Sequence, residues 1–129
     1  MPSQDPRHQR GRLGEAAARH VLEQRGYRIL AENYRCKLGE ADLVAEEGDV
    51  LVFVEVKTRR SLRHGLPREA VTPRKQQRLG RAAMAYCAEH ELGDRGCRFD
   101  VVEVLVDGSR ITHVEVLRHA FVPPTEENW

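Results

Sequence analysis

Three charged residues lie near the ends of two short apolar segments that are neighbours in the chain. Asp42 belongs to G-E-A-D-L at 39–43, and Glu55 and Lys57 belong to V-F-V-E-V-K at 52–57. Carboxylates without His or Cys partners are hard oxygen ligands that favour Mg²⁺ or Mn²⁺ over zinc. Two carboxylates leave an octahedral ion several open positions for water and phosphate oxygens. The pattern therefore predicts a site suited to metal-assisted hydrolysis.

A β-hairpin is needed to bring these residues together. The segments 40–45 and 50–57 are rich in branched residues, as strands are, and the Gly48-Asp49 pair between them has the chemistry of a type II′ turn. In an antiparallel pair the numbers of facing residues have a constant sum, which a two-residue turn at this pair sets at 97. Asp42 is therefore expected to face Glu55. A four-residue loop gives the same register, whereas a bulge would change it.

Alternation along the two strands predicts one apolar face and one mixed face. The apolar face, expected in the core, consists of Ala41, Leu43, Ala45, Val52, Val54 and Val56. The mixed face carries Val44, Leu51 and Phe53 toward the turn and Glu40, Asp42, Glu55 and Lys57 at the far end, with Glu40 opposite Lys57. Facing like charges destabilise a sheet, so Asp42 and Glu55 need a divalent cation or Lys57 between them. The alternative to a metal site is a salt-bridge cluster in which Lys57 neutralises Glu40 and Glu55.

The charge of the chain is distributed unevenly, although its net value is only +1. The segment from Lys57 to Arg81 holds nine basic residues and one acidic residue, a charge of +8 that leaves −7 for the remainder. Such asymmetry favours an anionic ligand, above all a phosphate backbone. The expected nucleic-acid contacts are Arg59, Arg60 and Arg63 after the second strand and Arg74, Lys75, Gln76 and Arg78 at the start of a helix. For the first three, an ordinary solvated loop is the alternative.

The pattern of the remaining chain predicts a single α/β domain. Thr72 and Pro73 have the residue types of an N-cap and a first helical position, so a helix is expected to begin at Pro73. Another helix is expected at 11–25, and further strands at 27–34, 99–106 and 111–117. Asp100 lies inside a strand and is expected to accept hydrogen bonds from a nearby helix or loop. The predicted boundaries are a flexible N-terminus at 1–10, the domain at 11–117 and a tail at 118–129.

Several classes of protein are disfavoured. The longest apolar runs, such as Val50–Val54, are far shorter than the ~20 residues that a membrane span needs. The polar and basic N-terminus is not followed by the apolar run of a signal peptide. Three widely spaced cysteines, Cys36, Cys87 and Cys97, without a C-x-x-C pair, argue against a disulfide scaffold or a structural zinc site and predict reduced thiols. The sequence therefore predicts a cytoplasmic protein without a membrane partner.

The two charged segments match the signature of the PD-(D/E)XK nucleases, an acidic residue followed after about a dozen residues by E-x-K on the next strand. Ala41 stands where the name of the signature has proline. Together with R-L-G-E at 12–15, G-Y-R-I-L at 26–30 and R-F-D-V-V at 98–102, the segments resemble the uncharacterised YraN family. These are small proteins related in fold to archaeal Holliday junction resolvases, and the resemblance covers roughly 11–117.

The resemblance implies a restriction endonuclease-like α/β core, in which helices flank a mixed central sheet of about five strands. It implies Asp42 and Glu55 as metal ligands and Lys57 as the residue that orients the attacking water. Glu15 would be an additional catalytic acid and metal ligand, the alternative being a solvated acid on a helix surface. The implied function is a Mg²⁺- or Mn²⁺-dependent endonuclease that acts on DNA, branched or otherwise structured, as a homodimer. The alternative is a non-catalytic nucleic-acid-binding or assembly module that retains the fold.

Overall fold

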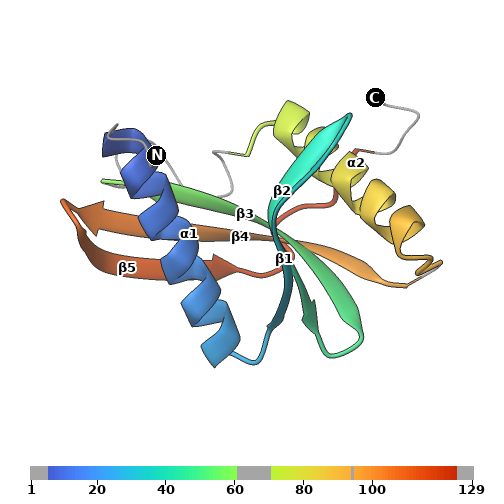
Figure 1. Cartoon of the computed structure of the whole chain (residues 1–129), viewed down its shortest axis with the longest axis horizontal. Helices are drawn as coiled ribbons and strands as arrows, with labels where there is room; N and C mark the ends of the chain where they lie inside the picture. The colour runs from blue at the N-terminus through green and yellow to red at the C-terminus, as the bar shows by residue number, and fades with distance from the viewer. Residues whose placement is uncertain (1–5, 61–70, 94, 125–129) are drawn as a thin grey trace.

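A computed structural model describes residues 6–60, 71–93 and 95–124 of the chain. Its elements, in order, are α1 (Pro6–Gln24), β1 (Arg28–Cys36), β2 (Gly39–Glu47), β3 (Val50–Arg59), α2 (Pro73–Glu89), β4 (Cys97–Asp107) and β5 (Arg110–Leu117). The strands form one sheet in the order β1-β2-β3-β4-β5. Only β3 and β4 pair in parallel, because α2 carries the chain back between them. The predicted mixed five-stranded sheet flanked by helices is confirmed (Figure 1).

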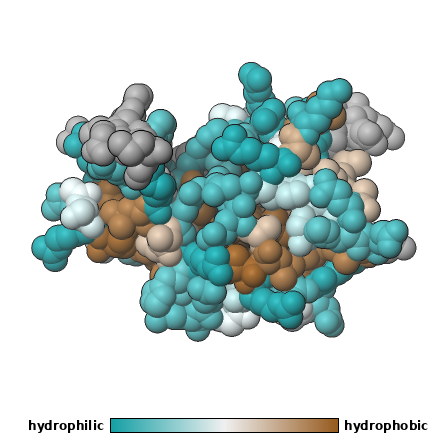
Figure 2. Space-filling view, viewed as in Figure 1, coloured by the Kyte–Doolittle hydropathy of each residue, from teal (hydrophilic) through white to brown (hydrophobic). Residues whose placement is uncertain are grey.

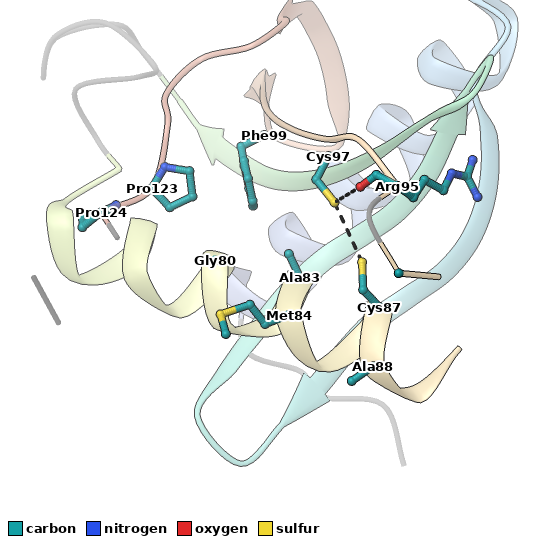
Figure 3. Close-up of a pocket in the computed structure, with 11 residues that line it drawn as sticks. Gly80, Ala83, Met84, Cys87, Ala88, Arg95, Cys97, Phe99, Pro123 and Pro124 are labelled. Atoms are coloured by element: carbon teal, nitrogen blue, oxygen red, sulfur yellow. Dashed lines mark hydrogen bonds between the residues drawn. The ribbon is translucent and has the colours of Figure 1, made fainter. Parts of the chain in front are cut away.

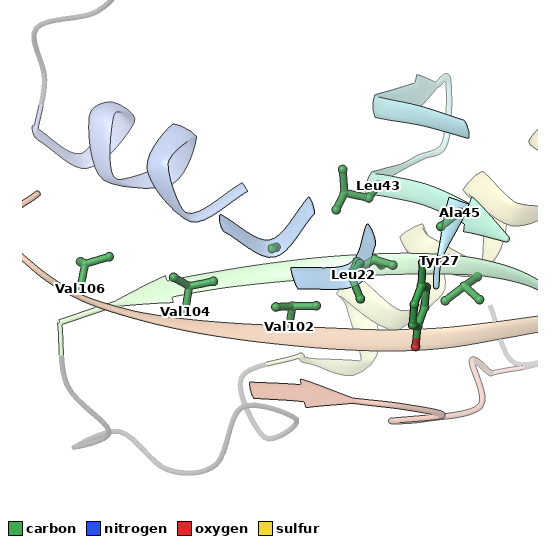
Figure 4. Packing of buried hydrophobic residues seen from close by; sticks show 10 residues of the cluster. Leu22, Tyr27, Leu43, Ala45, Val102, Val104 and Val106 are labelled. Atoms are coloured by element: carbon green, nitrogen blue, oxygen red, sulfur yellow. The ribbon is translucent and has the colours of Figure 1, made fainter. Parts of the chain in front are cut away.

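The two helices cover opposite faces of this sheet. On one face Ala18 and Leu22 of α1 pack against alternate residues of the central strands, among them Leu43, Val54 and Val102 (Figure 4). On the other face α2 packs over the remaining alternate residues. The members of that second cluster are Ala41, Val44, Leu51, Phe53, Leu79, Ala82, Ala83 and Tyr86. A sheet that is apolar on both faces around β2 and β3 leaves little room for charge there, so the few charged residues in it stand out.

The outer surface contrasts with this interior. The face shown in Figure 2 is mostly hydrophilic, with apolar residues visible in patches between polar ones. Neither helix that the structure describes is long and apolar enough to cross a membrane.

Both helices begin with a proline. The start of α2 at Pro73 was predicted, and the Thr72 side chain accepts a hydrogen bond from the Lys75 amide at 3.2 Å, as an N-cap should. The start of α1 at Pro6 is five residues earlier than the Gly11 expected from apolar spacing. Proline suits the first helical position because its missing N–H has no partner there in any case. The apolar periodicity is confined to the packed part of α1 and misses its exposed beginning.

The register of the central hairpin is the one that was predicted. Each paired position, from Leu43↔Val54 to Glu47↔Val50, has the sum 97, and Gly48 has the positive φ, 59°, that the first turn position requires. Two details differ from the prediction. The ladder stops at Leu43 and Val54, and Ala41 belongs to the α2 cluster and not to the α1 cluster with Leu43. Beyond Leu43, β2 therefore leaves β3 and turns toward α2.

Two glycines permit the close approach of helix and strand on either side of this separation. A Cβ on Gly39, the first residue of β2, would overlap the carbonyl oxygen of Arg78 in α2. A Cβ on Gly14 in α1 would overlap the hydroxyl of Thr58 in β3. Only glycine brings the backbones this close without a shift of one element. The motifs that contain these glycines, R-L-G-E and G-E-A-D-L, thus describe packing as well as charge.

Asp100 has the structural role that was predicted for it. Its fully buried carboxylate accepts hydrogen bonds from the Tyr27 hydroxyl at 2.8 Å, from Arg98 at 2.9 Å and from the His119 amide at 2.9 Å. These donors come from the segment after α1, from β4 itself and from the segment after β5. One buried acid therefore fastens three distant parts of the chain, and the cost of its burial is offset by charge-assisted hydrogen bonds.

Candidate metal and phosphate site

The two acids of the predicted site meet where β2 and β3 separate. The main-chain ladder ends at Leu43 and Val54, and Asp42 and Glu55 are the next residues of the two strands. Oδ2 of Asp42 accepts a hydrogen bond from the Val56 amide at 2.7 Å. The Asp42 side chain thus takes the place of the strand carbonyl that β2 no longer offers. This bond fixes the carboxylate in the gap between the strands.

Two lysines approach the second acid from different elements. Oε1 of Glu55 lies 3.7 Å from Nζ of Lys57, on the same strand, and 3.9 Å from Nζ of Lys75, near the start of α2. The side chains of Glu55 and Lys57 are only 17% and 20% exposed, whereas that of Lys75 is 46% exposed. Sequence reasoning assigned Lys75 to phosphate binding. The structure places it within ion-pair distance of Glu55.

The electrostatic environment shifts the pKa values of all three charged groups in the gap, and each shift disfavours the charged form. Burial, and then repulsion by Asp42, raise the pKa of Glu55 to about 7. Burial also raises the pKa of Asp42, although the Val56 amide and Lys57 act in the opposite direction. The pKa of Lys57 is lowered, first by burial and then by Lys75, against the attraction of Glu55. Two carboxylates held together in this way are stabilised by a shared proton or by a cation.

Glu15 reaches the same place from α1. A cavity of about 410 Å³ opens beside the gap, lined by Arg10, Gly11, Glu15, Asp42, Glu55, Val56, Lys57 and Thr58. Burial, and then Asp42, raise the pKa of Glu15, so its charge faces the pair of acids. The approach depends on Gly14, which lies against Thr58. Arg10 also lines the cavity, although sequence reasoning did not select it because it lay in the part expected to be flexible.

The donors around this cavity match a hard divalent cation. Asp42 and Glu55 offer carboxylate oxygens without a competing His or Cys in the lining, which suits Mg²⁺ or Mn²⁺ better than zinc. Within residues 6–60, 71–93 and 95–124, no three His, Cys, Asp or Glu side chains lie close enough together to form a metal-binding group. Glu15 therefore lines the cavity without joining the pair. The residues fit a metal held by two carboxylates, with room for water and phosphate oxygens.

The predicted salt-bridge partner of Lys57 lies elsewhere. Glu40 was expected opposite Lys57, but β2 has already left β3 at that position, and Oε1 of Glu40 lies 3.4 Å from Nε of Arg78 in α2. That expectation is wrong, because it assumed that the ladder continues past Leu43. Lys57 instead lies 3.7 Å from Glu55 and lines the cavity beside Asp42.

The predicted phosphate contacts on α2 fall into two groups. Arg74 and Lys75 are both exposed on the first turn, and Lys75 approaches Glu55. Gln76 donates its side-chain amide to the Val71 carbonyl at 3.1 Å, and Arg78 contacts Glu40. Arg74 and Lys75 are exposed where an anion would meet a helix N-terminus, although Lys75 also lies within ion-pair distance of Glu55. Gln76 and Arg78, in contrast, are less exposed and are bound to other parts of the protein.

The predicted contacts that follow Lys57 also differ among themselves. Nε of Arg59 lies 2.9 Å from Oε1 of Glu103, a fully buried acid on β4, although the two groups form no well-aligned hydrogen bond. The guanidinium assigned to phosphate binding thus already has a partner inside the sheet. Arg60 is exposed, and Arg63 lies outside the described residues. The signal for Glu103 was an acid within the apolar run V-V-E-V-L-V at 101–106.

Comparison with known proteins assigns the chain to a family. The profile of the Uncharacterised protein family UPF0102 matches residues 14–104, which include Glu15, Asp42, Glu55 and Lys57. The chain belongs to the UPF0102 family. The match extends from the middle of α1 into β4 and so contains the second half of α1, all of α2 and the hairpin that carries the acids.

Individual UPF0102 relatives are similar over nearly their whole length. A UPF0102 protein of Moorella thermoacetica is 51% identical over 116 residues, which are 89% of this chain and 97% of the relative. One of Syntrophus aciditrophicus is 48% identical over 113 residues, 86% of this chain and 87% of the relative. One of Pelotomaculum thermopropionicum is 47% identical over 118 residues, 91% and 98% of the two chains. The family resemblance that the motifs indicated is confirmed.

Proposed function

We propose that this UPF0102 protein is a Mg²⁺-dependent endonuclease that hydrolyses phosphodiester bonds in DNA. The proposal is supported above all by the gap between β2 and β3, where Asp42 is fixed by the Val56 amide at 2.7 Å and Lys57 lies 3.7 Å from Glu55. Two half-buried acids that repel each other, with a lysine beside them and a cavity in front, have the chemistry of a cation site that meets a phosphate. Their raised pKa values indicate that the charged carboxylates are disfavoured in this place, and a bound cation would stabilise them.

Each residue of the cavity then has a role. Asp42 and Glu55 would hold the Mg²⁺ ion, with Glu15 as an additional ligand from α1. When bound, the ion supplies a Lewis acid and lowers the pKa of coordinated water. Lys57 donates hydrogen bonds from Nζ to the attacking water and to a non-bridging phosphate oxygen, where it offsets developing negative charge. Because burial and Lys75 lower its pKa, the Lys57 ammonium gives up a proton more readily than an exposed lysine.

The substrate class follows from the surroundings of the cavity. Exposed basic side chains, those of Arg60, Arg74 and Lys75, are suited to backbone phosphates. Among the described residues, the large exposed apolar side chains are Leu38, Met84 and Val122, and none of these is an aromatic platform for base stacking. Binding is therefore directed at the backbone, and its strength falls with salt. Branched or structured DNA, a homodimer that presents two sites and a cytoplasmic location belong to the same proposal.

A cleavage assay tests the proposal directly. Pure protein is incubated with branched, duplex and single-stranded DNA and with RNA, each with Mg²⁺, with Mn²⁺ and with EDTA. Cleavage in either metal and none in EDTA is expected. Lys57→Ala should lower the rate by about 10²–10³-fold, the range for removing one donor to developing charge.

Lys37→Ala is the matched control, because Lys37 is exposed in the turn between β1 and β2. This variant should cleave at the wild-type rate. Nucleic-acid binding that is unchanged in EDTA, with no cleavage of any substrate, would overturn the nuclease proposal. That result would favour a non-catalytic binding module.

The binding module is the second candidate, and one observation favours it. In the part of the chain that the structure describes, no three potential ligands form a metal-binding group, although the basic residues Arg10 and Lys57 still line the cavity. A protein of this kind would retain the fold and the phosphate contacts without turnover. In that case Lys75→Ala should weaken binding while Glu55→Gln strengthens it, because the variant removes a negative charge from the surface that meets phosphate.

A further inference from the structure

Two cysteines that are separate in the sequence are in contact in the fold. The Sγ atoms of Cys87, in the last turns of α2, and Cys97, the first residue of β4, lie 3.8 Å apart (Figure 3). Both are free thiols. The third cysteine, Cys36, is also free and lies at the end of β1. The chain thus contains one close pair of thiols and one single thiol for comparison.

The pair can be reached from solvent. Cys97 is exposed and Cys87 is half-buried. Both line an open cavity of about 640 Å³, together with Gly80, Ala83, Met84, Ala88, Gly93, Arg95, Phe99, Pro123 and Pro124. This cavity shares no lining residue with the one beside Asp42. A small reagent can therefore meet the thiols without entering the acid site.

Two ligand chemistries suit neighbouring thiols, and the surroundings favour one of them. A thiophilic metal ion such as zinc would need about four ligands. No third His, Cys, Asp or Glu completes such a group within the described residues. A disulfide needs only the two sulfurs, and they must approach by about 1.8 Å to reach a bond of about 2.05 Å. Both cysteines lie near the ends of their elements, where the backbone adjusts most easily.

We propose that Cys87 and Cys97 form a reversible disulfide by exchange with a low-molecular-weight disulfide. The bond would join the end of α2 to the start of β4, the strand that pairs in parallel with β3. The two thiols line a cavity separate from the one beside Asp42, and the proposed disulfide does not depend on the function proposed for that acid cavity.

The exchange proceeds in two balanced steps. The thiolate of Cys97 attacks one sulfur of the small disulfide, a mixed disulfide forms on Cys97, and one small thiolate leaves and takes up a proton. The thiolate of Cys87 then attacks the Cys97 sulfur, the bond between the two cysteines forms, and the second small thiolate leaves. Two protein thiols are oxidised and the small disulfide is reduced to two thiols. A small thiol in excess reverses both steps.

The protonation of Cys97 before exchange sets how the rate of this scheme depends on pH. Burial and the neighbouring Cys87 raise the pKa of Cys97 to about 11. Cys97 is therefore mostly protonated near neutral pH, so its exchange with a small disulfide is slow there and becomes faster as the pH rises. The sequence predicted reduced thiols, and in this proposal the pair stays reduced until a small disulfide oxidises it.

Incubation of the full chain with oxidised glutathione tests the proposal, followed by mass spectrometry of the intact chain and of its peptides without reduction. The expected product is a monomer that has lost two hydrogens, with Cys87 and Cys97 in one linked pair of peptides, restored by dithiothreitol. Its Tm should exceed that of the reduced chain, because the cross-link restricts the unfolded state. Cys36→Ser should give the same product at the same rate.

Cys97→Ser provides the second arm and should leave no internal link. Three results would overturn the proposal: a glutathione adduct that persists on Cys97 without closure, preferential reaction of Cys36, or a dimer linked through Cys97. Circular dichroism of each variant establishes that it is folded. Since both substitutions exchange a thiol for a hydroxyl of similar size, loss of the link in one and its retention in the other isolates the role of the pair.

Discussion

The fold holds Asp42 and Glu55 close together in a place where burial disfavours the charged form of both carboxylates. The Val56 amide fixes Asp42, and the end of the β2–β3 ladder leaves Glu55 beside it with few other partners. Lys57 and Lys75 lie 3.7 and 3.9 Å from Glu55, which reduces the repulsion without removing it, since the pKa of Glu55 is still raised to about 7. Strain of this kind at a few charged residues is typical of sites that bind or react.

Replacement of Glu55 by Gln should therefore change how stability depends on pH. The pKa of Glu55 is raised from 4.5 to about 7, so the folded chain binds this proton more tightly than the unfolded chain does. The contribution of Glu55 is then complete below pH 4.5 and is lost as the pH rises through 7. Between these limits the free energy of unfolding of the wild type should fall by ~1–3 kcal/mol relative to Glu55→Gln.

Denaturant titrations at a series of pH values, without divalent metal, measure this difference. Glu91→Gln serves as the control, because Glu91 is exposed after the end of α2. Its difference from the wild type should not vary over the same range of pH. A constant difference for Glu55→Gln as well would show that the two acids are not coupled.

Magnesium should restore the stability that the repulsion removes. A ligand that binds only the folded chain stabilises it by about 1.4 kcal/mol at ten times its Kd. We expect a rise in Tm on addition of Mg²⁺ at pH 8 for the wild type and none for Asp42→Asn, which keeps the shape of the side chain and loses its charge. Glu15→Gln should retain part of the rise, because Glu15 lines the cavity without joining the pair. An equal rise in all three proteins would place the ion elsewhere.

At the scale of elements, the site depends on the separation of β2 from β3, and Gly39 makes that separation possible. A Cβ at this position would overlap a backbone carbonyl of α2, which cannot rotate away. At Gly14 the overlap is with the Thr58 side chain, whose hydroxyl and methyl groups can rotate, whereas its Cβ, at 2.9 Å, moves only with the backbone. Gly39→Ala should therefore destabilise the fold by about 1–3 kcal/mol or more, and Gly14→Ala by less.

A double substitution distinguishes the two glycines. Thr58→Ala removes the hydroxyl and the methyl group that meet position 14 but keeps the Cβ at 2.9 Å, so it should restore part of the stability lost in Gly14→Ala, as measured by denaturant titration. No side-chain substitution should rescue Gly39→Ala, because its obstacle is the Arg78 carbonyl. Failure of Thr58→Ala to rescue Gly14→Ala would mean that backbone limits the approach of α1 to β3, as it limits the approach of β2 to α2 at Gly39.

The elements also explain which features could be predicted. The register of the hairpin follows from two turn residues and a period of two, both of which are local. The point where the ladder stops depends on the packing of Gly39 beneath Arg78, a contact between segments 39 residues apart in number that no local pattern contains. For the same reason Glu40 was paired wrongly with Lys57, and its contact with Arg78 was not foreseen.

At the scale of the whole molecule, the sequence showed the charge asymmetry but not which of the basic residues form ion pairs within the protein. The count of +8 between Lys57 and Arg81 treats all nine basic residues alike. In the fold, Arg59 pairs with the buried Glu103 across the parallel β3–β4 register, and Arg78 pairs with Glu40. These partners come from other elements, so a count along the chain could not assign them. Lys75 and Arg74 remain exposed at the helix start, and Lys75 lies beside Glu55.

Lys75 should therefore contribute to nucleic-acid affinity, and Arg59 should not. Each phosphate contact that is lost lowers the slope of log K against log salt concentration by about 1. Lys75→Ala is expected to show this change for duplex DNA, measured by fluorescence anisotropy in EDTA so that no cleavage occurs. Arg28→Ala is the control, since Arg28 is exposed at the start of β1 and pairs with Glu46 near the hairpin turn, at the end of the strands opposite to the acids, and it should leave the slope unchanged. Equal slopes for Lys75→Ala and the wild type would mean that DNA does not meet the helix start, and the basic segment would then need another explanation.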